Sequence, residues 1–140
     1  MQLTRRKTLV LGIGGLAAAA LPMPAVAAAL DEAIAAFTSG AAIGEGSGLT
    51  LTAPEIAENG NTVPIAVSAP GASEIAIFAT GNPEPGVATF KFGPLSGSQS
   101  ASTRIRLAKT QDVTAIAKMA DGSFIKTSAT VKVTIGGCGG

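Results

Sequence analysis

The chain has 140 residues, of which 46% are apolar, and it contains no His, Trp or Tyr. This length suggests one domain, whose core must be built from Val, Ile, Leu, Ala and five Phe. The absence of His removes many catalytic and metal-binding arrangements. Ten basic residues stand against nine acidic ones, without a basic cluster or interleaved aromatic residues, so the sequence gives little support to nucleic-acid binding.

The amino end has the pattern of an export signal. Arg5 and Arg6 precede an apolar run from Leu9 to Leu21, and the small residues Ala-Val-Ala end at Ala27. This order predicts a cleaved signal over residues 1–27, and the paired arginines favour the twin-arginine route. A membrane anchor is the alternative, but the run is shorter than the ~20 residues that a span needs. Cleavage leaves seven basic and nine acidic residues, and we expect a soluble periplasmic protein.

Residues 28–48 are expected to form a short helix and a linker. Apolar residues recur at i, i+4 and i+7 over Leu30–Phe37, which predicts a helix there. Asp31 and Glu32 fall in its first turn, where acidic residues suit the helix dipole. Gly40 is a plausible stop, and Gly44–Gly48 is interpreted as a flexible link. The link is unlike a phosphate-binding loop, because no strand precedes it and no Lys-Ser/Thr pair follows.

Residues 49–135 change to an apolar period of two, which predicts a series of short strands. The expected strands are Leu49–Ala53, Thr62–Ser68, Glu74–Thr80, Val87–Phe92, Ser102–Leu107, Asp112–Met119 and Ser123–Ile135. Turn signals separate them at Asn59-Gly60-Asn61, Pro70-Gly71 and Asp121-Gly122. The alternation directs Val63, Ile65 and Val67 into the core. It also directs Ile135, at the end of the last expected strand, into the core. Seven such strands predict an all-β fold, an immunoglobulin-like β-sandwich.

The last five residues form a tail, residues 136–140, that holds the only cysteine, Cys138. The cysteine lies between two glycine pairs, which are Gly136, Gly137, Gly139 and Gly140. Because glycine is the least restricted residue, the local sequence holds this thiol in no one conformation. An odd cysteine in an exported protein indicates intermolecular pairing or a working thiol.

Three other interpretations of Cys138 stand beside a working thiol. It could be incidental in a disordered tail, or it could link two structural modules through an interchain disulfide. A cysteine nucleophile of an enzyme is disfavoured, because the sequence places no base and no orienting residue beside it. A single thiol without His is also a poor metal site, so no metal is expected.

Three segments of the chain resemble the SoxY family, the sulfur-carrier subunits of the periplasmic thiosulfate-oxidising (Sox) system. They are the tail Gly136–Gly140, the segment Pro54–Pro64 and the segment Ala115–Ser123, and they follow a twin-arginine leader. The resemblance implies a carrier that is acted on by enzymes and has no catalytic residue or cofactor of its own. Cys138 is then the point of covalent sulfur attachment, and the four glycines beside it form a swinging arm.

The resemblance also implies a set of protein partners. The carrier works as a heterodimer with a second β-sandwich subunit, SoxZ. The haem-containing sulfur transferase SoxAX loads the thiol, and the sulfur then passes between the hydrolase SoxB and the sulfane dehydrogenase SoxCD. The weakly charged region Val63–Val67 is a candidate for an apolar contact, although the sequence does not identify the binding face.

Overall fold

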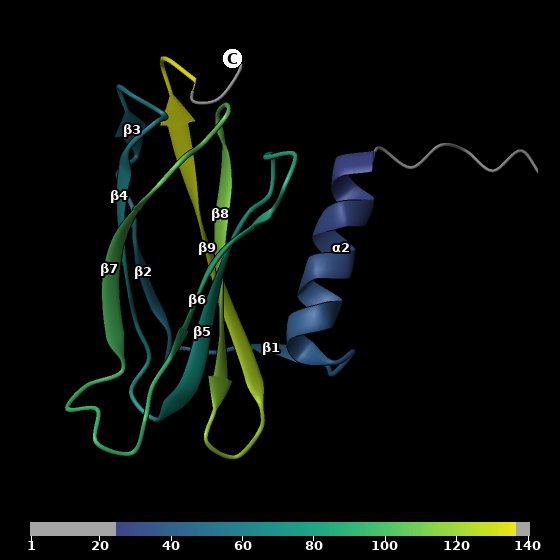
Figure 1. Cartoon of the computed structure of the whole chain (residues 1–140), viewed down its shortest axis with the longest axis vertical. Coiled ribbons are helices and arrows are strands. Elements are labelled where there is room, and N and C mark those ends of the chain that lie inside the picture. The colour runs from purple at the N-terminus through teal and green to yellow at the C-terminus, as the bar shows by residue number, and fades with distance from the viewer. Residues whose placement is uncertain (1–24, 137–140) are drawn as a thin grey trace, which may run out of the picture.

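Two β-sheets face each other in the computed structural model, which describes residues 25–136 (Figure 1). The strands are β1 (Ile43–Glu45), β2 (Thr50–Thr52), β3 (Ile56–Ala57), β4 (Val63–Ser68), β5 (Ala72–Ala79), β6 (Gly86–Lys91), β7 (Ser100–Ile105), β8 (Gln111–Met119) and β9 (Phe124–Val133). The larger sheet has the order β1-β9-β8-β5-β6, with β3 also paired to β9, and the smaller sheet has the order β2-β4-β7. The expected immunoglobulin-like β-sandwich is confirmed, with β1 and β3 as additional short strands.

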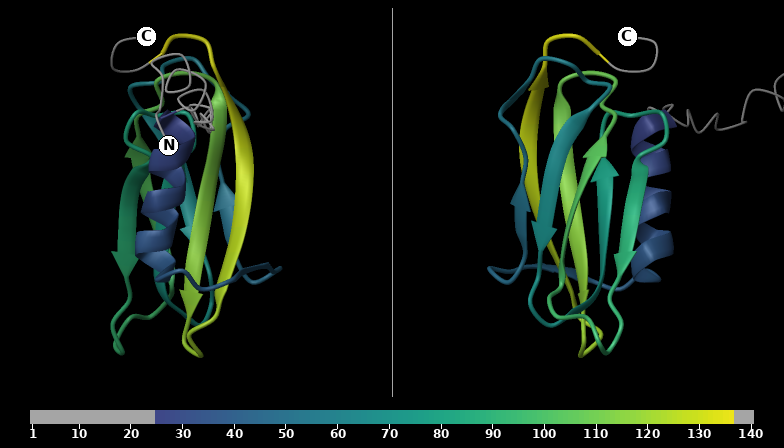
Figure 2. Two further views of the ribbon diagram at one scale, coloured as in Figure 1. Left: turned by 90° about the vertical axis from the view of Figure 1, so that its right-hand side faces the viewer. Right: turned by 60° about the vertical axis from the view of Figure 1, so that its left-hand side comes forward.

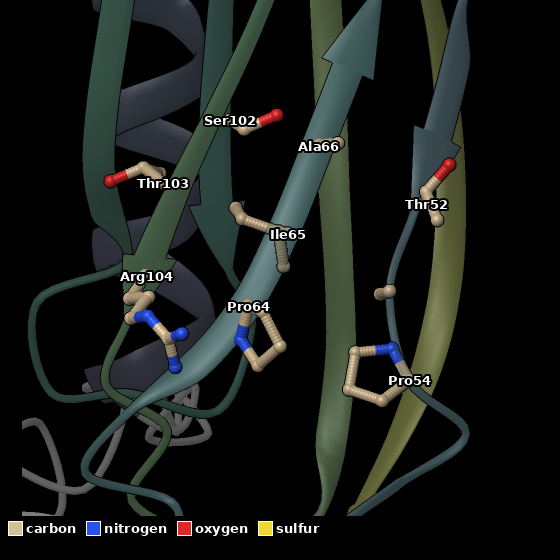
Figure 3. A pocket seen from close by; sticks show the side chains of 9 residues that line it. Thr52, Pro54, Pro64, Ile65, Ala66, Ser102, Thr103 and Arg104 are labelled. Atoms are coloured by element: carbon tan, nitrogen blue, oxygen red, sulfur yellow. The ribbon is translucent and has the colours of Figure 1, made fainter.

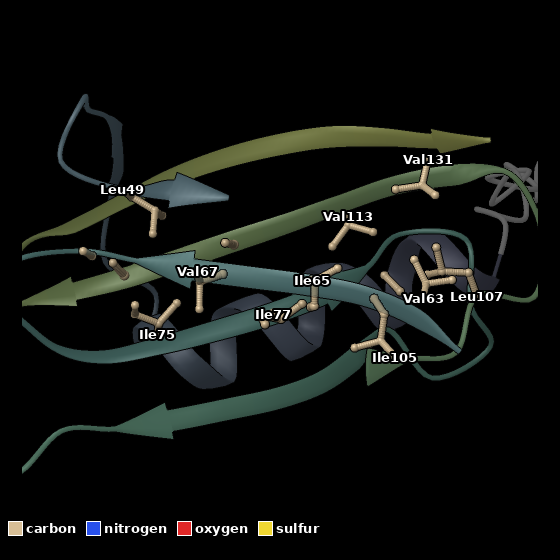
Figure 4. Packing of buried hydrophobic residues seen from close by; sticks show 14 of the residues in the cluster. Leu49, Val63, Ile65, Val67, Ile75, Ile77, Ile105, Leu107, Val113 and Val131 are labelled. Atoms are coloured by element: carbon tan, nitrogen blue, oxygen red, sulfur yellow. The ribbon is translucent and has the colours of Figure 1, made fainter. Parts of the chain in front are cut away.

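The main core lies between the two sheets, as the period of two predicted (Figure 4). Val63, Ile65 and Val67 of β4 are buried and face Ile75 and Ile77 of β5 across the sandwich. Burying side chains of this kind contributes roughly 1.5–3 kcal/mol each. This layer therefore fixes the relative position of the sheets and of the strand ends.

A helix, α2 (Ala25–Thr38), covers the outer face of the larger sheet (Figure 2). Its Phe37 packs edge-to-face against Phe124 and Phe78, with ring centroids 5.8 and 6.3 Å apart. These rings belong to a second apolar cluster, which explains why β5 and β8 are buried on both faces. The helix ends at Thr38, and Gly40 beyond it has a φ of 76°, a conformation that glycine adopts more readily than other residues. Within residues 25–136, no helix is long and apolar enough to cross a membrane.

The helix is longer than the sequence pattern predicted. It begins at Ala25 rather than Leu30, so Asp31 and Glu32 lie beyond its first turn. The added residues are mostly alanine, the best helix former, which carries no periodic signal.

Two other expectations about the chain were wrong, the first because long-range strand pairing overrides the local sequence. Residues Gly44 and Glu45 of the expected link belong to β1, which pairs in parallel with β9. The last strand stops at Val133, and Ile135 is 67% exposed instead of entering the core. The chain bends after β9, so the alternation of the strand no longer governs the direction of that side chain.

Candidate functional site

Strand β9 carries the chain out of the sandwich toward the cysteine-bearing tail. The described chain ends at half-buried Gly136, three residues after β9. Cys138, with Gly137, Gly139 and Gly140, lies outside the described residues, and so do Arg5 and Arg6 of the leader. The structure therefore describes the attachment of the tail, residues 132–136 and the groups that hold them, which we call the arm base.

On one side, β3 holds the arm base through main-chain hydrogen bonds. The N–H of Lys132 donates to the carbonyl of Glu55 at 2.9 Å, and the N–H of Thr134 donates to Ala57 at 3.0 Å. The Thr134 hydroxyl adds a third bond, to the carbonyl of Glu58 at 3.0 Å. The hydrogen bonding on this side therefore continues one residue past Val133, the last residue of β9.

On the other side, the side chain of Thr110 continues the hydrogen bonding to β9 beyond the end of strand β8. The β8–β9 ladder ends where Gln111 lies opposite Val131. The next N–H of β9 on the side of β8, that of Val133, donates instead to the Thr110 hydroxyl oxygen at 2.9 Å. This hydroxyl also lies 3.4 Å from the Val133 carbonyl, so one threonine satisfies the main chain of β9 after its neighbour has ended.

Gly60 makes the final attachment before the tail. Its N–H donates to the carbonyl of Ile135 at 2.7 Å, and its own carbonyl accepts from the N–H of Leu107 at 2.8 Å. The Asn59 side chain shapes this turn by accepting from the N–H of Asn61 at 3.0 Å. The turn at residues 59–61 was predicted, but its role was not: it ties residue 135 to the smaller sheet.

The surface beside the arm base is partly apolar. Ile56 of β3 is 59% exposed and Ile135 is 67% exposed, and with Leu95 they are the exposed large apolar side chains of residues 25–136. Exposed apolar residues are common singly on protein surfaces. Ile56 lies opposite Lys132 in the β3–β9 pairing, and Ile135 follows β9 by two residues. Among residues 25–136, no group of three or more His, Cys, Asp or Glu could hold a metal.

A separate hollow of about 560 Å³ lies on the outer face of the smaller sheet (Figure 3). Proline, alanine and Ile65 are its apolar lining residues, and Arg104 is the charged one. The lining residues are Thr52, Ala53, Pro54, Pro64, Ile65, Ala66, Ser102, Thr103 and Arg104. The hollow includes part of the weakly charged Val63–Val67 region that the sequence identified.

The described residues define an immunoglobulin-like β-sandwich whose last strand leads, in sequence, toward the single cysteine. The family model "Sulfur oxidation protein SoxY" matches residues 34–138, a match that reaches Cys138. The chain belongs to the SoxY family. Membership supports a sulfur-carrier role in Sox thiosulfate oxidation, as one component of a system of proteins and not as a catalyst.

The solved structures agree with this assignment. The sulfur carrier protein SoxY from Chlorobium limicola f thiosulfatophilum is 40% identical, with 78% of this chain and 99% of that chain covered and a TM-score of 0.68. A superoxide reductase (neelaredoxin) from Ignicoccus hospitalis is 18% identical, with 61% and 79% covered and a TM-score of 0.54. A putative superoxide reductase from Thermotoga maritima is 17% identical, with 61% and 84% covered and a TM-score of 0.52. The two reductases share the fold alone. No curated protein sequence matches this chain.

Proposed function

We propose that Cys138 carries sulfur covalently during thiosulfate oxidation, first as a thiosulfonate and later as a persulfide. Joining the thiol to the outer sulfur of thiosulfate forms one S–S bond, releases the thiol proton and is a two-electron oxidation. A haem iron accepts one electron at a time, so the haem-containing sulfur transferase SoxAX would have to remove the two electrons in sequence. Hydrolysis of the terminal S–S bond of the thiosulfonate then consumes one water, releases sulfate and leaves the persulfide on Cys138. The observation that carries the proposal is the match to the SoxY family, which extends to the only cysteine.

The arm base supports a carrier that works by reaching into its partners. Main-chain bonds hold residues up to Ile135, and Cys138 follows Gly136 by two residues. At roughly 3.3–3.6 Å per extended residue, the Cα of Cys138 reaches about 7 Å beyond that of Gly136. Partner active sites must therefore be narrow pockets close to the docked surface, and glycine suits them because it adds no side chain to the arm.

The chemistry of the thiol also suits a carrier. No basic residue lies within five positions of Cys138 in the sequence, so its immediate neighbours offer no cation that would favour the thiolate. Because the thiolate is the reactive form, the thiol is inert between encounters and is activated inside each partner. SoxAX, SoxB and SoxCD are these partners in the proposal, and SoxZ is the second subunit of a heterodimer.

Export by the twin-arginine route completes the proposal, because that route carries folded protein and allows SoxZ to assemble with the chain beforehand. Arg5 and Arg6 are the residues that the exporter recognises. Replacing both with lysine should leave the precursor in the cytoplasm. Normal accumulation of that variant in the periplasm would contradict this route without affecting the carrier chemistry.

Two variants of the tail test the carrier role in a reaction reconstituted with the partner enzymes. Cys138→Ser should abolish sulfur loading while the fold and the complex with SoxZ persist. Gly137→Val keeps the thiol but adds a branched side chain to the arm, so loading should fall steeply. Loading of Cys138→Ser would refute covalent carriage, and a normal rate for Gly137→Val would refute the narrow-pocket argument.

A further inference from the structure

Two loops meet at the end of the sandwich that carries the arm base, the upper end in Figure 1. Residues 80–85 join β5 to β6, and residues 106–110 join β7 to β8. The β7–β8 loop takes part in two attachments of the arm base. Its Thr110 accepts from the main chain of β9, and the N–H of Leu107 donates to Gly60, whose own N–H bonds to the end of the arm base. The arm base is therefore held where this loop places it.

Asn82 of the β5–β6 loop bonds to the β7–β8 loop on both sides of Leu107. Its Nδ2 donates to the carbonyl of Arg106 at 2.8 Å, and its Oδ1 accepts from the N–H of Ala108 at 3.0 Å. A main-chain carbonyl can only accept and a main-chain N–H can only donate, so the two contacts need one side chain that does both. Aspartate lacks the donor, whereas asparagine fits the pair.

Gln111, the first residue of β8, ties the same loop down beyond Thr110. Its Nε2 donates to the Asn82 Oδ1 at 2.8 Å and to the carbonyl of Lys109 at 3.0 Å. Its Oε1 accepts from the N–H of Gly81 at 2.7 Å. Gln111 is only 7% exposed, and a satisfied polar network shielded from water rigidifies the segments that it joins. The two amide side chains thus fix the residues on either side of Thr110.

We propose that Asn82 is a positioning residue for the sulfur-carrying arm, and that it acts through residues 106–110. For its effect on sulfur transfer, the inference rests on the proposed carrier function of Cys138. The Cα of Cys138 reaches only about 7 Å beyond that of Gly136, so the arm has little length with which to offset a displaced base. A misplacement of about 1 Å can slow a reaction about a hundredfold. The position of the thiol inside a partner therefore depends on how firmly Asn82 holds the β7–β8 loop.

Amide hydrogen exchange of the full chain tests the structural part of the proposal. Asn82→Ala removes all three bonds of that side chain, so the amides of Val133 and Gly60 should exchange about fivefold faster. The amide of Thr134, which bonds to β3, should change less. Asn61→Ala is the matched control, because it removes an exposed amide at the same end of the sandwich and keeps the main-chain N–H.

A double variant tests the route from Asn82 to the arm base. If Asn82 acts through Thr110, adding Asn82→Ala to Thr110→Val should change the exchange of Val133 by less than about twofold, whereas independent effects would multiply. Asn82→Asp keeps the oxygen that accepts from Ala108 and loses the donor to Arg106. Its exchange should lie between those of the wild type and Asn82→Ala, and it decides if Asn82→Ala fails to fold.

Enzymatic loading of Cys138 tests the functional part. With the partner enzymes present, kcat for Asn82→Ala should fall about threefold or more, because the thiol is misplaced after docking. KM should change by less than about twofold, since the change leaves docking itself intact. The reaction of Cys138 with a small disulfide reagent, which needs no partner, should keep its rate.

Four results would overturn the proposal. They are equal exchange at Val133 in Asn82→Ala and Asn61→Ala, multiplied effects in the double variant, an unchanged kcat, or a loss of loading that lies in KM alone. A failure of the carrier function would look different, because the wild type itself would then take up no sulfur. If only the positioning role fails, the wild type and Asn82→Ala load Cys138 equally fast.

Discussion

Replacing Thr110 with valine should loosen the arm base without unfolding the sandwich. The change keeps the shape of the side chain and removes the oxygen that accepts from the N–H of Val133 at 2.9 Å. An exposed hydrogen bond of this kind contributes about 1 kcal/mol net. The second contact, 3.4 Å to the Val133 carbonyl, is long and adds little. A loss of about 1 kcal/mol in local opening free energy corresponds to about fivefold faster exchange.

Amide hydrogen exchange measures this effect directly. The Val133 amide should exchange about fivefold faster in Thr110→Val, while the amides bonded to β3 change less because their acceptors remain. Thr110→Ser is the control, since it retains the hydroxyl oxygen. Urea unfolding should show a loss of at most about 1.5 kcal/mol in global stability. Equal exchange at Val133 in the valine and serine variants would show that Thr110 does not hold the arm base.

Three further predictions concern the body of the sandwich. Ile116→Ala, at a fully buried position beneath α2, should lower the free energy of unfolding by about 2–5 kcal/mol in urea. Gly71→Ala should cost about 1–2 kcal/mol in the same assay, because its φ is 84°, whereas Gly86→Ala should cost less because that residue has open space and no positive φ. The Ser123 hydroxyl and the Ser123 N–H both donate to the Asp121 carboxylate. Both bonds lower the pKa of that carboxyl, and the hydroxyl has the larger effect. These bonds stabilise the fold fully at pH values above the ordinary pKa of Asp. The stabilisation is lost as the pH falls through the lowered pKa of Asp121 in the folded protein. Because Ser123→Ala removes the hydroxyl, an NMR titration of that variant should show a higher Asp121 pKa.

The sandwich could be predicted from the sequence because its signal is local and repeated. The strands β4, β5, β7 and β8 lie within about two residues of their expected bounds, and the positions of Val63, Ile65 and Val67 follow the period of two. The hairpin at Asp121-Gly122 has the turn chemistry that its sequence specified, with φ at 87° for Gly122. These features need no knowledge of distant parts of the chain.

The arm base could not be predicted in the same way, because it depends on contacts between distant segments. Strand β3 has two residues, and it exists only because β9 lies beside it. Thr110 carries no signal in the sequence beyond its position before β8. The segment Pro54–Pro64 was identified by resemblance, and the structure supplies a physical role for it: Gly60 and the residues before it hold the end of β9.

The covalent attachment of sulfur to Cys138 is tested most directly by the mass of the mature protein from thiosulfate-grown cells. Intact-mass spectrometry before and after treatment with a reducing thiol, followed by fragmentation of the carboxyl-terminal peptide, locates any adduct. A fraction of chains should carry thiosulfonate or persulfide sulfur on Cys138, and the reducing thiol should remove all of it. A protein with only free thiol or only protein–protein disulfide at Cys138, under conditions of active thiosulfate oxidation, would contradict the carrier role.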